Sequence, residues 1–311
     1  MTGGASKRDA ARGLWLGVLA MAMFGLTLPM TQLAVGSAAA PQLSPLFVTS
    51  ARAVVAAGLS ALLLWTTRAP WPRRAHWPAL AIAALGNAIG YPLLLAWSLR
   101  HVSSAHAAVI TALAPLLTAV AAAIVMRQRA RLGFWGCALA GCALVVAYSL
   151  LRAAGSGNAG LAPGAVDAVL FVAVLAASIG YVYGARVTPE LGAERVICWV
   201  TLVALPVTLP VALLNWPAQP VAASAWVGFG YVSLFSMWIG FFAWYRALAI
   251  GGALRVSQVQ LLQPFFAMGF AWPLLGERIE LQSLGFAIAV IATVWLGRRF
   301  SASPSPARTV R

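Results

Sequence analysis

Ten long apolar stretches dominate this sequence. They cover residues 13–35, 45–67, 77–99, 104–126, 132–151, 164–186, 196–216, 222–248, 254–276 and 281–297. A helix of about 20 apolar residues spans the hydrocarbon core of a bilayer, whereas a strand of an outer-membrane barrel has roughly ten residues of alternating polarity. Only 9% of the residues are charged, against about 25% in soluble domains. The stretches therefore predict an all-α integral membrane protein with ten transmembrane helices.

The basic residues predict the orientation of these spans. If the N-terminus is inside, ten crossings place 17 of the 21 Lys and Arg residues inside and only Arg100, Arg152 and Arg278 outside, with Arg52 within a span. Cytoplasmic loops of membrane proteins carry an excess of Lys and Arg. We therefore expect a multi-pass protein of the cell inner membrane with both termini in the cytoplasm. The basic charge then indicates a lipid bilayer as partner and no nucleic acid.

The middle of the sequence divides the spans five and five. Residues 153–163 are mostly small and predict a flexible linker between a first repeat, residues 1–152, and a second, residues 164–300. Because five is odd, the second set enters the membrane from the opposite side, and such inverted repeats are typical of transporters. The Ser-, Pro- and Arg-rich residues 301–311 predict a disordered cytoplasmic tail.

A shift of 149 residues supports the duplication. It places Pro115 on Pro264, and it also superposes three further pairs: Arg129 on Arg278, Leu132 on Leu281, and Gly136 on Gly285. Both prolines fall near the middle of a span, where a proline removes a backbone hydrogen bond and kinks the helix. Backbone groups freed at membrane depth must face protein or a water-filled cavity. The fourth and ninth spans therefore predict hinges that line a central cavity, with an ordinary tolerated kink as the alternative.

Several chemistries are absent from the sequence. Lys7, in the N-terminal segment, is the single lysine, so there is neither a phosphate-binding lysine motif nor an intramembrane Schiff-base lysine. The three cysteines and three histidines form no metal-ligand spacing. We expect no metal, no cofactor and no enzymatic activity, and the sequence indicates neither a coupling ion nor an oligomeric state.

The second half carries a recognisable motif. From Ala247 to Gly285 the sequence resembles the end of an EamA domain of the drug/metabolite transporter superfamily: a helix with a central proline, Leu-Gly-Glu-Arg at 275–278, and a Gly-containing helix. The first half resembles the same domain through Pro115, Arg129 and Gly136, but has Arg127 and Gln128 where the pattern has Gly and Glu. Arg52 matches an arginine often found in the second helix of this family. The resemblance implies a ten-helix transporter of small metabolites, often an exporter.

Polar residues within the spans are the candidates for a substrate cavity. Arg52 would attract a carboxylate or another anionic group, or would instead reach the interface or tie helices together. Gln260 and Gln263 share one helix face beside Pro264, and Thr111 holds the repeat position of Gln260. These amides predict either a neutral transport site or hydrogen bonds between helices. The complete set of expected cavity residues is Arg52, Asn87, Tyr91, Thr111, Tyr181, Gln260 and Gln263.

Other polar and aromatic residues lie near the ends of spans. Glu277 and its neighbour Arg278 predict a gating group or a structural ion pair at the turn between the last two spans. Asp167 is expected to cap the helix that it begins. Trp97, Trp199, Trp216 and Trp244 are expected as interfacial anchors. No carboxylate is clearly buried, so the sequence predicts no proton relay.

Together these features favour a secondary transporter, most simply an exporter of amino acids or related small metabolites. Substrate would bind between the halves and be exposed alternately to the two sides. A channel or non-transporting scaffold is the alternative. A membrane-embedded enzyme fits less well, because the sequence has neither a nucleophile motif nor a histidine cluster.

Overall fold

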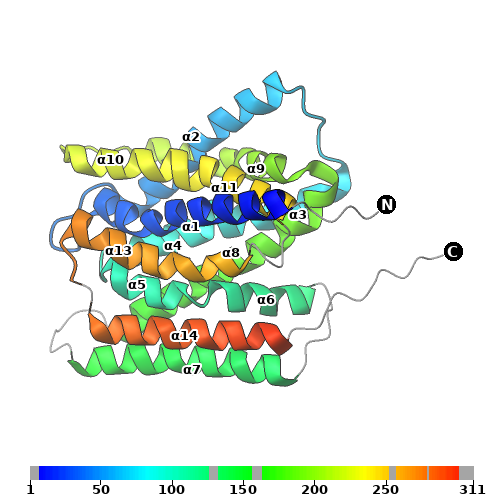
Figure 1. Ribbon diagram of the computed structural model, residues 1–311. Helices are drawn as coiled ribbons and strands as arrows, with labels where there is room; N and C mark the ends of the chain where they lie inside the picture. The colour runs from blue at the N-terminus through cyan, green and yellow to red at the C-terminus, as the bar shows by residue number, and fades with distance from the viewer. Residues whose placement is uncertain (1–6, 126–131, 156–162, 252–256, 279, 301–311) are drawn as a thin grey trace.

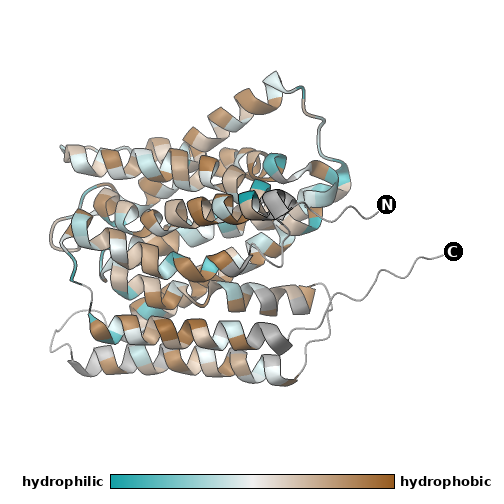
Figure 2. Ribbon diagram, in the orientation of Figure 1, coloured by the Kyte–Doolittle hydropathy of each residue, from teal (hydrophilic) through white to brown (hydrophobic). Residues whose placement is uncertain are grey.

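The computed structural model describes residues 7–125, 132–155, 163–251, 257–278 and 280–300 (Figure 1). Within these ranges the regular elements are helical, and β pairing is limited to one antiparallel bridge between Gly36 and Pro41. Figure 2 shows hydrophobic residues along most of the length of the helices. The expectation of an all-helical, apolar architecture is confirmed.

Seven helical stretches are long and apolar enough to cross a membrane. They are Ala11–Val35, Pro45–Thr66, Arg74–Ser98, Ser104–Ala122, Gly164–Leu191, Glu194–Leu214 and Ala223–Trp244. Three shorter apolar helices, Trp135–Leu144, Val259–Leu275 and Leu281–Thr293, lie where the fifth, ninth and tenth spans are expected. The apolar helices thus follow the expected order, and the count of ten crossings stays a prediction.

Several of the spans are interrupted helices. The first half contains α1 (Lys7–Val35), α2 (Pro45–Thr66), η1 (Arg74–His76), α3 (Trp77–Ala83), η2 (Ala84–Gly90), α4 (Tyr91–Ser98), α5 (Ser104–Thr111), α6 (Ala114–Val125) and α7 (Leu132–Gly155). The second half contains α8 (Pro163–Leu191), α9 (Ala193–Leu214), α10 (Ala223–Tyr231), η3 (Val232–Ile239), α11 (Gly240–Gly251), η4 (Ser257–Leu262), α13 (Gln263–Leu275) and α14 (Leu281–Phe300).

The helices of the two halves are interleaved. α1 packs against α10, α11 and α13 of the second half, and α8 packs against α3, α4 and α6 of the first. α2 packs on α9, α5 on α13, and α7 on α14, the last pair side by side at the lower edge of Figure 1. α1 begins and α14 ends at the right-hand end of the bundle in that view. The main core draws on both halves, with Leu28, Phe47 and Leu170 almost fully buried.

Two spans contain a wide π-helical turn. η2 covers Ala84–Gly90 and η3 covers Val232–Ile239. A shift of 149 residues carries 84–90 onto 233–239, so the two interruptions occupy corresponding positions. π turns inside longer helices are often found at functional sites.

The spans with central prolines are broken rather than kinked. Between α5 and α6, Ala112 and Leu113 form a turn, and Pro115 is the second residue of the new helix. In the second half the 3-10 segment η4 ends at Leu262, and Pro264 is the second residue of α13. A proline is well placed there, because the first residues of a helix have no intrahelical partner for their N–H groups.

One helix contact is too close for any side chain. A Cβ atom added to Gly86 in η2 would lie 2.4 Å from the carbonyl oxygen of Ala176 in α8. A Cβ on Gly180 of α8 would lie 2.6 Å from Oδ1 of Asn87. Glycine therefore permits η2 and α8 to meet along their backbones, as small-residue spacing does in other membrane helices.

Some expectations lie outside the described residues. They include Arg127 and Gln128, residues 156–162 of the expected linker, and the tail 301–311. Where the linker was expected to begin, at residue 153, helix α7 instead continues to Gly155.

Candidate functional site

Two adjoining cavities lie inside the helix bundle. The larger contains about 690 Å³ of atom-free space and the smaller about 400 Å³, their openings included. Four residues line both cavities: Phe24, Tyr91, Tyr181 and Gln263. The walls come from both halves of the chain, so one cargo of metabolite size could contact both cavities and both halves at once.

The expected cavity residues all line this space. Tyr91, Thr111, Tyr181, Gln260 and Gln263 line the larger cavity together with Pro115 and Pro264. Arg52 and Asn87 line the smaller one, beside Tyr91, Tyr181 and Gln263. Residues that are far apart in sequence are thus gathered around one volume, and whether they bind a substrate stays a prediction.

Arg52 is the one charged residue among the residues that line the cavities. Its side chain is buried, with a residue exposure of 4%. Nη2 donates a hydrogen bond to Oγ of Ser236 at 3.1 Å and contacts Sδ of Met237 at 3.7 Å, while the buried Nε has no partner. Among the described residues no carboxylate forms an ion pair with Arg52. The position therefore holds a buried cation whose charge no described side chain neutralises.

The π-helical turns supply the polar groups around Arg52. Asn87 belongs to η2 and Ser236 to η3, and a shift of 149 residues places one on the other. Oγ of Ser236 also accepts a hydrogen bond from Oγ1 of Thr27 at 2.9 Å. Oδ1 of Asn87 is buried without a partner. An unpaired buried acceptor is costly unless a ligand or water satisfies it.

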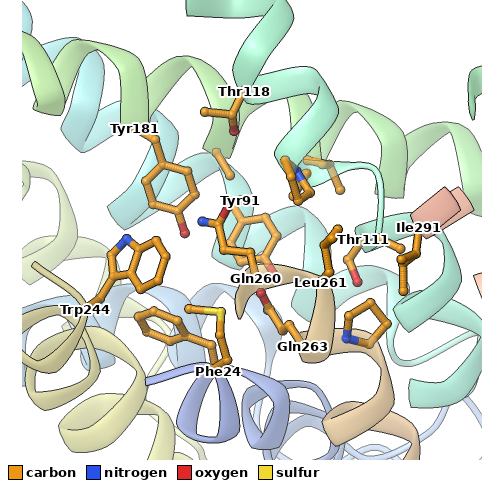
Figure 3. A pocket seen from close by; sticks show the side chains of 17 residues that line it. Phe24, Tyr91, Thr111, Thr118, Tyr181, Trp244, Gln260, Leu261, Gln263 and Ile291 are labelled. Atoms are coloured by element: carbon orange, nitrogen blue, oxygen red, sulfur yellow. The ribbon is translucent and has the colours of Figure 1, made fainter. Parts of the chain in front are cut away.

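Aromatic and amide side chains form the wall of the larger cavity. Figure 3 shows Tyr181, Trp244 and Gln260 directed toward one another, with Phe24 beside Trp244. Trp244 is 7% exposed and packs in a cluster with α1. The expectation that Trp244 is an interfacial anchor is therefore wrong, because α11 continues to Gly251 and places Trp244 more than one turn inside.

Residues of α1 are absent from the expected set. Met21, Phe24 and Thr27 line the cavities at intervals of three residues along α1. This spacing keeps them on one helix face. The surrounding residues of α1 are also apolar, so the sequence does not distinguish this face from the others. The face is identified by the packing of α1 against helices of the second half.

Glu277 contacts the start of another helix. Oε1 accepts a hydrogen bond from the backbone N–H of Ser104 at 2.9 Å, and Oε2 accepts one from Ala105 at 3.0 Å. A carboxylate is favourable at a helix N-terminus, where N–H groups are unpaired and the helix dipole is positive. Arg278 is exposed, and the ion pairs of the described residues do not include Glu277–Arg278. Glu277 therefore links the end of α13 to α5.

Asp167 is also placed differently from the expectation. It is 5% exposed, and its Oδ1 lies 2.6 Å from Nε2 of His106, which is 6% exposed. The expectation that no carboxylate is buried is wrong. No sequence pattern indicates this pair, because the two residues are 61 positions apart and each lies near the start of an apolar stretch.

The cavities offer binding groups but no catalytic constellation. Hydroxyl, amide, guanidinium and aromatic groups surround them, and within the described ranges no three His, Cys, Asp or Glu side chains could hold a metal ion. Such an arrangement can hold a small molecule by one charged contact, several neutral hydrogen bonds and aromatic packing.

Comparison with known proteins gives consistent results. The EamA-like transporter family matches residues 11–150 and again residues 165–297. A Bacillus subtilis (strain 168) protein named as the uncharacterized transporter YdeK is 38% identical over 292 residues, which cover 92% of this chain and 97% of that protein. A Streptantibioticus cattleyicolor protein named as a probable terminal-alkyne amino-acid exporter is 27% identical over 300 residues, which cover 93% of this chain and 94% of that protein. A solved crystal structure covers 95% of this chain and 99% of its own at a TM-score of 0.62 and 15% identity, which shows a shared fold.

Proposed function

The chain belongs to the EamA-like transporter family and is a transporter rather than an enzyme, and on this premise we propose that it exports small carboxylate-bearing metabolites of amino-acid size. The observation that carries the proposal is Arg52, a buried cation at the cavity with no carboxylate partner among the described residues. A carboxylate of the cargo would supply the missing counter-charge. Burying an unpaired charge is costly, so the cargo that neutralises it is favoured.

The cavity walls suit the rest of such a molecule. The ring faces of Phe24, Tyr91, Tyr181 and Trp244 provide an apolar surface beside the polar end. Carbonyl oxygens of Gln260 and Gln263 can accept hydrogen bonds from an amino group, and aromatic faces attract ammonium ions. The distant relative named as an amino-acid exporter agrees with this class of cargo.

The mechanism that we propose is alternating access between two inverted five-helix repeats, residues 1–152 and 164–300. Three features support it: the family matches the chain twice, the two π turns correspond under one shift, and both proline-containing spans are broken at corresponding places. The contacts are also reciprocal, since α1 packs on α11 and α13 as α8 packs on α3, α4 and α6. The breaks before Pro115 and Pro264 would act as hinges on either side of the cargo.

We place the protein in the inner membrane with both termini in the cytoplasm, since 17 of the 21 basic residues then face that side. The position of the start of α1 and the end of α14 at one end of the bundle agrees with this arrangement.

The test uses purified protein in lipid vesicles and labelled L-phenylalanine, which carries both a carboxylate and a ring. Arg52→Gln keeps a polar side chain and removes the charge. Losing a buried charge-paired contact costs about 2 kcal/mol or more, so the KM should rise at least about 30-fold. Arg195→Gln, which changes an exposed arginine, is the matched control and should transport normally. Phenethylamine, which lacks the carboxylate, should not compete.

Equal transport by Arg52→Gln and the parent protein would refute the role of Arg52. Effective competition by phenethylamine would refute the carboxylate class. Metabolite profiling of the medium of overexpressing cells, beside cells with Gln263→Ala, then tests export directly: one metabolite class should accumulate only with the parent protein.

A further inference from the structure

Away from the two cavities, one pair of ionisable side chains is buried on both sides within the described residues. His106 Nε2 and Asp167 Oδ1 are 2.6 Å apart, and the residues are 6% and 5% exposed. The second carboxylate oxygen, Oδ2 of Asp167, is buried with no hydrogen-bond partner. Elsewhere in the bundle, neutral hydroxyl groups join helices, as Thr27 with Ser236 and Thr201 with Ser60 do. A buried pair of ionisable side chains therefore calls for a physical explanation.

The proton content of this pair decides its net charge. With an imidazolium the buried pair is neutral, and without that proton it carries one negative charge. A buried, uncompensated carboxylate costs several kcal/mol. Ionisable residues inside membrane proteins commonly mark ion or proton pathways. Histidine is the side chain that changes charge between about pH 5 and pH 8.

The pair lies where it can control access to the cavities. His106 is on α5 and Asp167 on α8, so the contact joins the two proposed repeats. Asp167 precedes Val174, a lining residue of the larger cavity, by seven positions, which is two turns and about 10 Å on the same helix face. Thr111, also a lining residue, follows His106 on α5. The pair therefore stands between the cavity and one end of the bundle.

Few other ionisable groups face this contact from the neighbouring helices. The ring of Tyr148 on α7 lies 5.1 Å from the His106 ring, and Glu277 accepts its hydrogen bonds from the start of α5. Arg100, which precedes α5, donates to the backbone carbonyls of Val35 and Leu43. In the part of the chain that the structure describes, no Lys or Arg pairs with Asp167. The imidazole is thus the cation available to this carboxylate.

We propose that His106 and Asp167 form the proton site of a proton-coupled antiporter; this rests on the proposed transport function. The pair lies at the end where α5 and α8 begin, which is the outer end in the orientation proposed above. When this outer end closes, the imidazole takes one proton from the water outside, and the neutral pair holds α5 against α8. Transfer of that proton to water in the cavity leaves the carboxylate uncompensated and weakens the contact. The end then opens and the cargo leaves, so one proton enters for each molecule exported.

The test compares two modes of transport in vesicles that contain the full-length protein, with labelled L-phenylalanine as the probe. Exchange of labelled for unlabelled phenylalanine at equal pH needs no net proton movement. Accumulation of phenylalanine against its concentration gradient does need net proton movement. It is driven by a vesicle interior one pH unit more acidic than the outside, with the membrane potential clamped. One-for-one antiport supports up to about tenfold accumulation. An internal pH dye should report the matching proton efflux.

The variants are His106→Gln and Asp167→Asn, which keep polar side chains of similar size. Each should retain exchange, which also shows that it folds, and should lose the accumulation and the dye signal. Tyr148→Phe is the matched control. It removes another buried hydrogen bond between the halves, the one that joins the hydroxyls of Tyr148 and Ser283 at 3.0 Å. It removes neither an imidazole nor a carboxylate, so it should keep both modes.

Accumulation that survives in both variants would overturn the site. Exchange by the parent protein without accumulation would overturn proton coupling while leaving the transport function intact. Loss of accumulation in Tyr148→Phe as well would show that the pair acts only by holding the helices together. Absence of exchange in the parent protein would refute the proposed cargo, and the proton site with it.

Discussion

The contact between η2 and α8 makes a prediction that does not depend on the identity of the cargo. Gly86→Ala adds a Cβ atom 2.4 Å from the backbone oxygen of Ala176, and ordinary contact begins at 3.4 Å. A backbone atom cannot change rotamer, so the two helices must separate by about 1 Å. Overpacking of this kind costs about 1–3 kcal/mol. The Tm should fall by roughly 2–12 °C.

Thermal unfolding of the purified protein in detergent measures the effect. Gly58→Ala is the matched control, because a Cβ at that position in α2 meets nothing within 4 Å. Alanine favours helix over glycine by about 1 kcal/mol, so this control should melt at or above the parent temperature. If Gly86→Ala melts as high as Gly58→Ala, the close packing of η2 on α8 is wrong.

Three further predictions concern the site and its surroundings. Glu277→Gln removes the charge at the start of α5 and replaces one of the two accepting oxygens with an NH2 donor, so thermal unfolding should show a loss of about 1–3 kcal/mol; an unchanged Tm would contradict the capping role. Trp244→Ala removes a buried ring from the cavity wall and should raise the KM for L-phenylalanine more than that for L-alanine in vesicle uptake; equal effects on the two would argue against ring contact. Ser236→Ala removes the hydroxyl that accepts from Arg52 and Thr27, and leaves a buried donor unpaired at a cost of about 1–3 kcal/mol, which chemical or thermal unfolding should detect, whereas no destabilisation would mean that water replaces the hydroxyl.

Sequence reasoning is most informative where a residue type is rare in its surroundings. A single arginine within an apolar stretch is conspicuous, and so are neighbouring glutamines beside a proline. Arg52, Gln260 and Gln263 accordingly lie at the cavities as expected. Long apolar stretches likewise predict membrane helices, because the bilayer leaves few alternatives.

The errors have a common physical cause. For Glu277 the sequence offered a gating group or an ion pair with its neighbour Arg278, and the described hydrogen-bond partners are instead backbone groups more than 170 positions away. Asp167 was assigned to its own helix end, yet it faces His106 on another helix. Polar groups in an apolar bundle seek whichever partner three-dimensional packing brings near, since leaving them unpaired is costly. Sequence proximity is a poor guide to that partner.

The π turns illustrate a second limit. η2 contains two glycines and an asparagine, whereas η3 contains no glycine and two serines, so the two π turns share no residue pattern that would mark them in the sequence. Their positions depend on how the helices pack, and so does the placement of Asn87 and Ser236 in the same cavity wall as Arg52.

The cavity arginine of the first half has no charged counterpart in the second half. A shift of 149 residues takes Arg52 to Thr201, a neutral residue that is fully buried and hydrogen-bonded to Ser60. The two halves therefore enclose cavities whose lining has one charged side chain, Arg52. A cargo of the class proposed above would therefore bind in one direction, with its carboxylate toward α2, and a second carboxylate at its other end would meet no cationic side chain of the cavity lining. Under the proposed function, the presence of arginine at position 52 and threonine at position 201 would thus set the direction in which the cargo binds.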